Sequence, residues 1–291
     1  MHLKITNILA AAFFAACVSA RAQDNWADSV VSYVPGTGQN TAYETSGAAL
    51  GAVTTGMDGA TPYSISYAAY KTSQIVGVGN GGELTVEFDT PITNDPTDHA
   101  GGLDFTIFGN EFFVNGTGGV FSGAYDHAGL TVWVSQDNVN YYELAVPSSY
   151  ESDFGADSAF PTNQAGNAFL PVSPSLSLAS FTGLTSAQAL SLYNGSAGGA
   201  SYSISWAVNA EGTPVDLSSI SYVEVQGSSG FGYVDAISRV ENVQSVPEPS
   251  SAAFLMIAAT GAIVLLLRSR RGGLEQTGKR AAVVINDIFS T

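Results

Sequence analysis

The stretch LTVWVSQDNVNYYELAV, residues 130–146, contains the pattern that decides the fold. It reads as a strand, a turn at Asp137-Asn138 and a second strand, because Asp and Asn favour turns between runs of apolar and aromatic residues. A strand that turns back on itself within so few residues pairs in an antiparallel sense. This segment therefore predicts an antiparallel β-protein.

The same signals recur along most of the chain. GGELTVEFDTPI (81–92) alternates apolar side chains with Glu and Thr, which is the period of a strand with one buried face. One helix is expected over 185–195, beginning at Thr185 and ending at Asn194-Gly195, and 147–174 is expected to be a long surface loop. The fold predicted for 23–243 is an all-β, antiparallel β-sandwich of the jelly-roll kind. Its further strands are predicted at 103–113, 201–208, 220–226 and 232–242.

Residues 1–22 have the organisation of a secretory signal peptide. Lys4 precedes an apolar run over 8–18, and Ala20-Arg21-Ala22 is a small-x-small cleavage site, so the mature chain is expected to begin at Gln23. The single cysteine, Cys17, lies inside this segment, and the mature protein is then expected to have no disulfide. A lipid attached to Cys17 and an N-terminal core helix are the alternatives.

The C-terminal region contains a candidate membrane span. Residues 250–267 form an 18-residue run without a charge, within the ~17–25 residues that cross a bilayer as a helix. Arg268, Arg270 and Arg271 follow at once. By the positive-inside rule, the basic tail over 268–291 is expected to be cytoplasmic and the ectodomain to face outward.

The residues before and after this run form a pattern of their own. Val246-Pro247-Glu248-Pro249 stands before it and Arg268-Ser269-Arg270-Arg271 after it. The order resembles the PEP-CTERM sorting signal of bacteria, with 244–249 as its Pro-Glu-Pro linker. The resemblance implies an exosortase as partner, removal of the span, and delivery to the cell surface or the exopolysaccharide matrix. Twenty residues follow Arg271, more than such signals normally have.

A second resemblance concerns the ectodomain. WVSQDNVNYYEL resembles a strand–turn–strand of discoidin-like, galactose-binding-like domains, with Asn138 where Gly is usual. ISYVEVQGSSGFGYVDAISRV (220–240) resembles their closing hairpin. The resemblance implies a galactose-binding-like sandwich but specifies no chemistry, because one sandwich serves sugar binding, lipid binding and structural roles.

Charge excludes some classes of partner. Between Gln23 and Pro249 there are two cations, Lys71 and Arg239, and 23 acidic residues, which gives a net charge of −21. Such a surface repels nucleic acid and anionic lipid. It attracts divalent cations, so bound Ca²⁺ is an expectation for an exported protein, beside the simpler role of self-repulsion in solubility.

Four carboxylates are the candidate metal ligands: Asp104, Glu111, Asp126 and Asp235. All are expected at strand ends or in Gly-rich turns, where carboxylate and carbonyl oxygens can surround a hard cation. Ser203 stands where a further Asp would be expected. The alternative is that each acidic residue caps a turn.

Aromatic residues are the candidate ligand-binding groups. Tyr142 and Phe231 lie near turns, so we expect them on an exposed platform that could stack against sugars. Trp133 and Trp206 lie in alternating segments, so we expect them in the core.

No catalytic motif is found, and no catalytic residue is predicted. The expected function is that of an exported cell-surface or matrix protein, non-catalytic and binding polysaccharide. Two alternatives stay open. One is a secreted carbohydrate-active enzyme that uses a carboxylate pair among the four acidic residues, and the other is a permanently anchored single-pass surface protein.

Overall fold

The computed structural model describes residues 25–126, 129–147, 160–228 and 230–242. The chain divides into two compact units, 1–242 and 243–291, and every described residue belongs to the first. The described residues contain no helix with the length and apolar character that a bilayer crossing requires. The predicted signal peptide (1–22), sorting motif and membrane span (250–267) lie outside the described residues.

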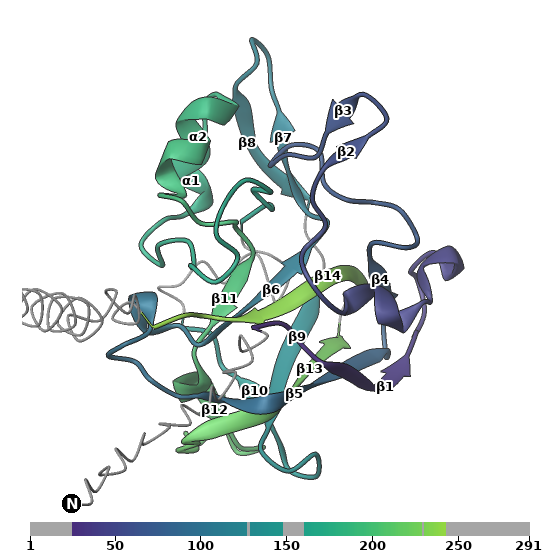
Figure 1. The fold of residues 1–291 in the computed structure, drawn as a ribbon, viewed down its shortest axis with the longest axis vertical. Coiled ribbons are helices and arrows are strands. Elements are labelled where there is room, and N and C mark those ends of the chain that lie inside the picture. The colour runs from purple at the N-terminus through teal and green to yellow at the C-terminus, as the bar shows by residue number, and fades with distance from the viewer. Residues whose placement is uncertain (1–24, 127–128, 148–159, 229, 243–291) are drawn as a thin grey trace, which may run out of the picture. The chain divides into compact units, whose positions relative to one another are not determined.

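Two antiparallel sheets form the body of the protein (Figure 1). A six-stranded sheet has the order β1-β5-β13-β9-β10-β12, and a four-stranded sheet has the order β11-β6-β14-β4. Two hairpins, β2–β3 and β7–β8, stand apart from them. The strands are β1 (Ser29–Val34), β2 (Met57–Asp58), β3 (Thr61–Pro62), β4 (Val76–Val78), β5 (Glu83–Thr93), β6 (Phe105–Gly109), β7 (Phe112–Asn115), β8 (Phe121–Asp126), β9 (Leu130–Ser135), β10 (Tyr141–Leu144), β11 (Ala200–Tyr202), β12 (Ala207–Val208), β13 (Ser219–Gly227) and β14 (Gly232–Arg239).

The core lies where alternate residues of the two sheets meet. Leu84, Val86 and Phe88 of β5 are at most 1% exposed, as the alternation in 81–92 predicts. Phe105 of β6 and Ile237 of β14 belong to the same apolar cluster. Each such side chain contributes about 1.5–3 kcal/mol when fully buried. The prediction of antiparallel sheets that pack as a sandwich is confirmed.

The deciding stretch folds as predicted, with one exception. Its strands are β9 and β10, and Asn138 in the turn has a φ of 60°, the left-handed conformation for which Gly is usual. The prediction that Trp133 packs in the core is wrong. Val132 and Val134 occupy the buried face of β9, so Trp133 points to the other face, where it is half-buried and donates to Thr131 Oγ1.

Two predicted strands are broken by local hydrogen bonds and turns. The strand expected over 103–113 becomes β6 and β7, and β7 leaves the sheet to pair with β8. The strand expected over 201–208 is interrupted by a 3-10 helix, Ile204–Trp206, because Asp104 and Ser203 accept the backbone N–H groups of Ile204 and Ser205. Trp206 ends this turn and packs against the core.

The predicted helix is present as α2 (Ser186–Leu192). Thr185 accepts a hydrogen bond from the Gln188 N–H while the Gln188 side chain accepts from the Thr185 N–H, which is a capping box. A shorter helix, α1 (Leu178–Phe181), was not predicted. Further 3-10 turns are Thr41–Tyr43, Ser46–Ala49 and Ala100–Gly102. The described part of the predicted surface loop has no strand or helix over 160–174, but it buries Phe160 and Val172.

A cluster of aromatic rings joins the β7–β8 hairpin to the two helices. The Phe113 ring lies 4.8 Å from that of Phe121 and 4.9 Å from that of Phe181. Phe160 and Tyr193 complete the cluster. We call the region formed by 112–125 and 160–195 the uncharged lobe, because its sequence contains no Asp, Glu, Lys, Arg or His.

The two ends of the described sandwich lie side by side. Trp26 forms a β-bridge with Ser238, and the Arg239 N–H donates to the Asn25 carbonyl. The Asn25 amide donates to the Glu241 carboxylate at 2.9 Å. The chain therefore enters and leaves the sandwich at one place, next to β14.

Candidate functional site

A cavity of about 260 Å³ has three aromatic side chains among its six lining residues. Tyr67, Tyr70 and Phe112 provide rings, and Asn110 and Ser66 provide groups that can form hydrogen bonds, with Ala68 completing the lining. This combination of apolar faces and a few polar groups is typical of small-molecule sites. The volume lies below the ~300–1,000 Å³ of drug-sized pockets, so it suits one ring of a larger molecule.

The chain forms this cavity by bringing together two distant segments. Ser64 and Tyr67 exchange backbone hydrogen bonds at 2.8 and 2.9 Å, which folds 64–67 into a tight turn. The turn is fixed because Ile65 is buried and its carbonyl accepts the Phe113 N–H at the start of β7. Tyr67 is thereby held beside Phe112.

Asp58, at the end of β2, fixes the two tyrosines. Its Oδ2 accepts the hydroxyl hydrogens of both Tyr67, at 2.9 Å, and Tyr70. Lys71 Nζ lies 3.0 Å from its other oxygen. The hydrogen bond from Tyr70, followed by those from Lys71 and Tyr67, lowers the pKa of Asp58 to about 2. Asp58 is therefore ionised at neutral pH, and the pKa of Tyr70 is raised in return.

Further aromatic side chains extend from the cavity toward Phe231. Tyr63 stacks on Tyr67 with ring centroids 5.8 Å apart, and the Tyr43 hydroxyl donates to the Tyr70 carbonyl. Tyr43 then contacts Tyr233, which in turn contacts Phe231. The predicted platform residue Phe231 is 42% exposed. The other predicted platform residue, Tyr142, is half-buried against the core of the sandwich.

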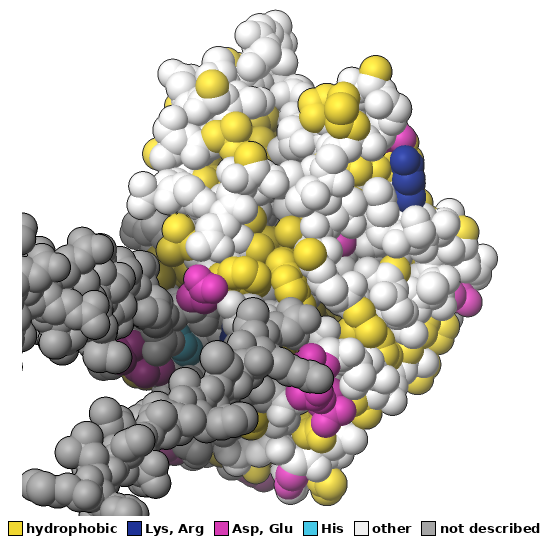
Figure 2. Space-filling view, viewed as in Figure 1, with side chains coloured by type: hydrophobic (Ala, Val, Ile, Leu, Met, Phe, Trp, Pro, Cys, Tyr) yellow, Lys and Arg dark blue, Asp and Glu magenta, His cyan; other side chains and the backbone are white. Residues whose placement is uncertain are grey.

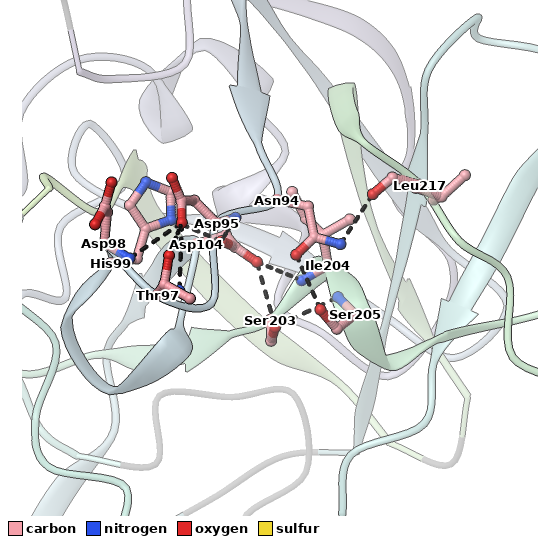
Figure 3. A network of polar contacts seen from close by, with 10 residues as sticks. All are labelled: Asn94, Asp95, Thr97, Asp98, His99, Asp104, Ser203, Ile204, Ser205 and Leu217. Carbon is pink, nitrogen blue, oxygen red and sulfur yellow. Dashed lines mark hydrogen bonds and ion pairs between the residues drawn. The ribbon is translucent and has the colours of Figure 1, made fainter.

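Asp104 is surrounded by internal partners (Figure 3). One carboxylate oxygen lies 2.6 Å from His99 Nδ1 and accepts the Asp95 N–H. The other accepts the Ile204 N–H at 2.7 Å and the Ser203 hydroxyl at 3.3 Å. Asp104 is fully buried, so its carboxylate joins the 94–104 loop to the turn after β11.

The loop itself is ordered by the neighbouring carboxylate of Asp95. Its Oδ1 accepts the Asp98 N–H at 3.0 Å and the Thr97 hydroxyl at 2.9 Å. The Asp98 hydrogen bond, followed by the one from Thr97, lowers the pKa of Asp95. These contacts hold His99 at the start of the next turn, where it reaches Asp104 (Figure 3).

The other predicted metal ligands lie at different places. Glu111 is 4% exposed, between β6 and β7, and Asp126 ends β8. Asp235 lies in β14 and accepts hydrogen bonds from the N–H and hydroxyl of Thr54. Burial raises the pKa of Asp235 to about 7. Over the described residues, no three His, Cys, Asp or Glu side chains are grouped so as to hold a metal. The calcium site stays a prediction.

The sequence contained a weak signal for the aromatic cavity. Three tyrosines, Tyr63, Tyr67 and Tyr70, occur within eight residues and are followed directly by Lys71. Lys71 is one of two cations in the ectodomain, and the other, Arg239, is buried and donates to the Thr90 carbonyl. Nothing in the sequence indicates that Asn110 and Phe112, some forty residues further on, line the same cavity.

The protein is thus an antiparallel β-sandwich with an aromatic surface cavity. Residues 245–271 match the PEP-CTERM protein-sorting motif, which includes Val246–Pro249 and the arginines 268, 270 and 271. The match confirms the predicted sorting motif and supports export, processing by an exosortase and a cell-surface location. No curated protein matches the chain.

Proposed function

We propose that this chain is an exported surface or matrix protein that binds polysaccharide without catalysis, and that the cavity of Tyr67, Tyr70 and Phe112 is its binding site. The observation that carries the proposal is the fixed pair of tyrosine rings. Asp58 holds both hydroxyls, so both rings are oriented before a ligand arrives. Less conformational entropy is then lost on binding.

The chemistry of the cavity suits a sugar ring. The faces of a sugar carry C–H groups that pack on aromatic rings, and its hydroxyls need hydrogen-bond partners. Asn110 and Ser66 are side chains that can supply those partners. The sandwich itself is proposed to be of the jelly-roll, galactose-binding-like kind.

The burial of three of the four candidate acidic residues supports a non-catalytic role. Glycoside hydrolysis by a carboxylate pair needs both groups to reach the glycosidic bond. Asp104, Glu111 and Asp235 are each at most 4% exposed, and Asp104 and Asp235 accept hydrogen bonds from within the protein. Substrate would have to displace these contacts to reach them.

The test compares binding with turnover. The exported protein is applied to a glycan array and, in parallel, incubated with the same polymers and assayed for released reducing ends. We expect binding to one polymer class without reducing ends. Hydrolysis of any polymer would favour the carbohydrate-active enzyme instead, and absence of binding across the array would refute the proposal.

The fate of the C-terminus is proposed as well. We propose that 1–22 is removed as a signal peptide and that an exosortase cuts near Pro247-Glu248-Pro249, leaving an ectodomain that begins at Gln23. Mass spectrometry of the mature C-terminus tests this. A chain that still ends in the basic tail over 268–291 would instead support permanent single-pass anchoring.

A further inference from the structure

Charge is unevenly distributed over the sandwich and its attached lobe. The 23 acidic residues of 23–249 include none in 112–125 or 160–195. In Figure 2 the upper left part of the molecule, where Figure 1 places β7, β8, α1 and α2, shows only uncharged side chains. The acidic side chains visible in this view gather mostly on the lower part. The uncharged lobe is therefore also an uncharged surface.

The cavity lies at the border of this lobe and carries no net charge of its own. Phe112, in its lining, is the first residue of β7, and Tyr67 is joined to the same hairpin through Ile65 and Phe113. Asp58 and Lys71 form an ion pair at 3.0 Å beside the tyrosines. At the upper right of Figure 2, basic and acidic side-chain atoms lie side by side.

An uncharged ligand suits both features. A carboxylate or sulfate entering an aromatic cavity would lose its hydration without gaining a counter-ion, since Lys71 is already paired, and this costs free energy. A polyanion would also be repelled by the net charge of −21. A polycation would be attracted to the acidic part of the sandwich rather than to the cavity.

We propose that the ligand is a neutral polysaccharide, one ring of which enters the cavity while the chain continues over the uncharged lobe. This rests on the proposed sugar-binding function and names the ligand class. The lobe offers hydroxyl and amide groups together with exposed apolar side chains such as Leu190 of α2, which is 37% exposed. These can contact sugar hydroxyls and C–H faces without an electrostatic contribution.

The experiment measures the binding of the exported protein to three immobilised polymers at low and high salt: a neutral hexose polymer, a uronic-acid polymer and a deacetylated hexosamine polymer. We expect the neutral polymer to be bound with an affinity that salt does not change, since no ion pairs form. The uronic-acid polymer should bind at least about tenfold more weakly, equivalent to ~1.4 kcal/mol. Binding to the hexosamine polymer should be abolished by salt.

Two matched variants test the lobe. Leu190→Glu adds a charge to the lobe, and Val139→Glu adds the same charge to an exposed apolar position, 78% accessible, in the turn between β9 and β10. We expect L190E to weaken binding of the neutral polymer about tenfold, equivalent to ~1.4 kcal/mol, and V139E to leave binding unchanged. The urea concentration at the midpoint of unfolding should be the same for both variants. A short oligosaccharide should bind both variants like the parent protein.

The outcomes separate the two proposals. If the uronic-acid polymer binds as tightly as the neutral one, the neutral class is wrong while sugar binding stands. If L190E and V139E bind the neutral polymer with equal affinity, the polymer does not contact the lobe. The inference that the polymer continues over the uncharged lobe is then overturned. If no polymer is bound, the proposed function itself fails. Association of the protein with itself, detected by light scattering without polymer, would identify a second copy as the occupant and overturn the inference.

Discussion

The Nδ1 atom of His99 lies 2.6 Å from an oxygen of the Asp104 carboxylate, and both side chains are buried. The same carboxylate accepts the backbone N–H groups of Asp95 and Ile204. One side chain therefore connects three segments, two of which are about a hundred residues apart. An acidic residue that the sequence presents as a candidate ligand is, in the described structure, a structural acceptor.

Asp104→Ala is expected to destabilise the sandwich strongly. It leaves two backbone donors and the His99 ring without their acceptor in a buried place, and each such loss costs about 1–3 kcal/mol. Asp104→Asn preserves the volume and one acceptor oxygen and should cost less. Urea denaturation measures both, and a D104A midpoint equal to that of the parent protein would contradict the structural role.

Asp235 should make stability depend on pH in an unusual direction. Its pKa of about 7 lies above that of an unfolded Asp, ~3.9. The folded state therefore binds more protons than the unfolded state between these values, so the free energy of unfolding falls as pH rises from about 4 to 7. Asp235→Asn should remove this contribution. Urea denaturation at several pH values checks it, and an identical slope in D235N would argue against the shift.

The hydroxyl contacts of Asp58 should matter for ligand binding. Tyr70→Phe keeps the ring but releases it from Asp58, and Asp58→Ala releases both tyrosines, so we expect polymer binding to weaken in Y70F and more in D58A. Tyr222→Phe is the matched control, because it removes a hydroxyl that donates to Glu87 on the six-stranded sheet. Titration of the neutral polymer measures the affinities, and equal loss in Y70F and Y222F would exclude a specific effect.

The capping box of α2 predicts a smaller effect. Thr185→Ala removes the side-chain acceptor for the Gln188 N–H and should destabilise the protein by about 1 kcal/mol, whereas Thr185→Ser should be close to neutral. Thermal or urea unfolding of both variants provides the comparison. Equal stabilities of T185A and T185S would mean that the side-chain cap contributes nothing.

Deletion of the sorting motif tests the cellular role. Removing Val246–Arg271 takes away both the apolar run and its arginines, so the ectodomain should appear in the medium instead of with the cells. Immunoblots of the two fractions measure this. Continued cell association of the deleted protein would imply retention by the ectodomain or by the N-terminus.

Sequence reasoning recovered the parts of the fold that depend on local pattern. Period-2 alternation located β5 and β13, and the capping signals located α2, because these features are set by neighbouring residues. It failed at 103–113, where the strand ends at Gly109. A Cβ on Gly109 would lie 2.6 Å from the backbone carbonyl oxygen of Tyr233 in β14, so any other residue at this position would require the backbone to shift.

The candidate site was harder to predict because it depends on tertiary contacts. Phe231 was expected on an exposed platform from its place near a turn, and it is exposed. The cavity, however, forms only when Asp58 and the segments 66–70 and 110–112 come together in the fold. No local pattern indicates that two segments forty residues apart share one surface. The polar surroundings of Asp104 depend in the same way on Ile204, a hundred residues away.

The strand that leads out of the sandwich has a mechanical consequence. β14 is paired along its length, with β4 over its first residues and with β6 over the rest, and the chain departs from its far end. A pull on residue 242 that is directed along the axis of β14 would load the cross-strand contacts of this strand in shear, so that they share the force. Strands loaded along their axis resist rupture better than strands that unzip, because their contacts must break together rather than one after another.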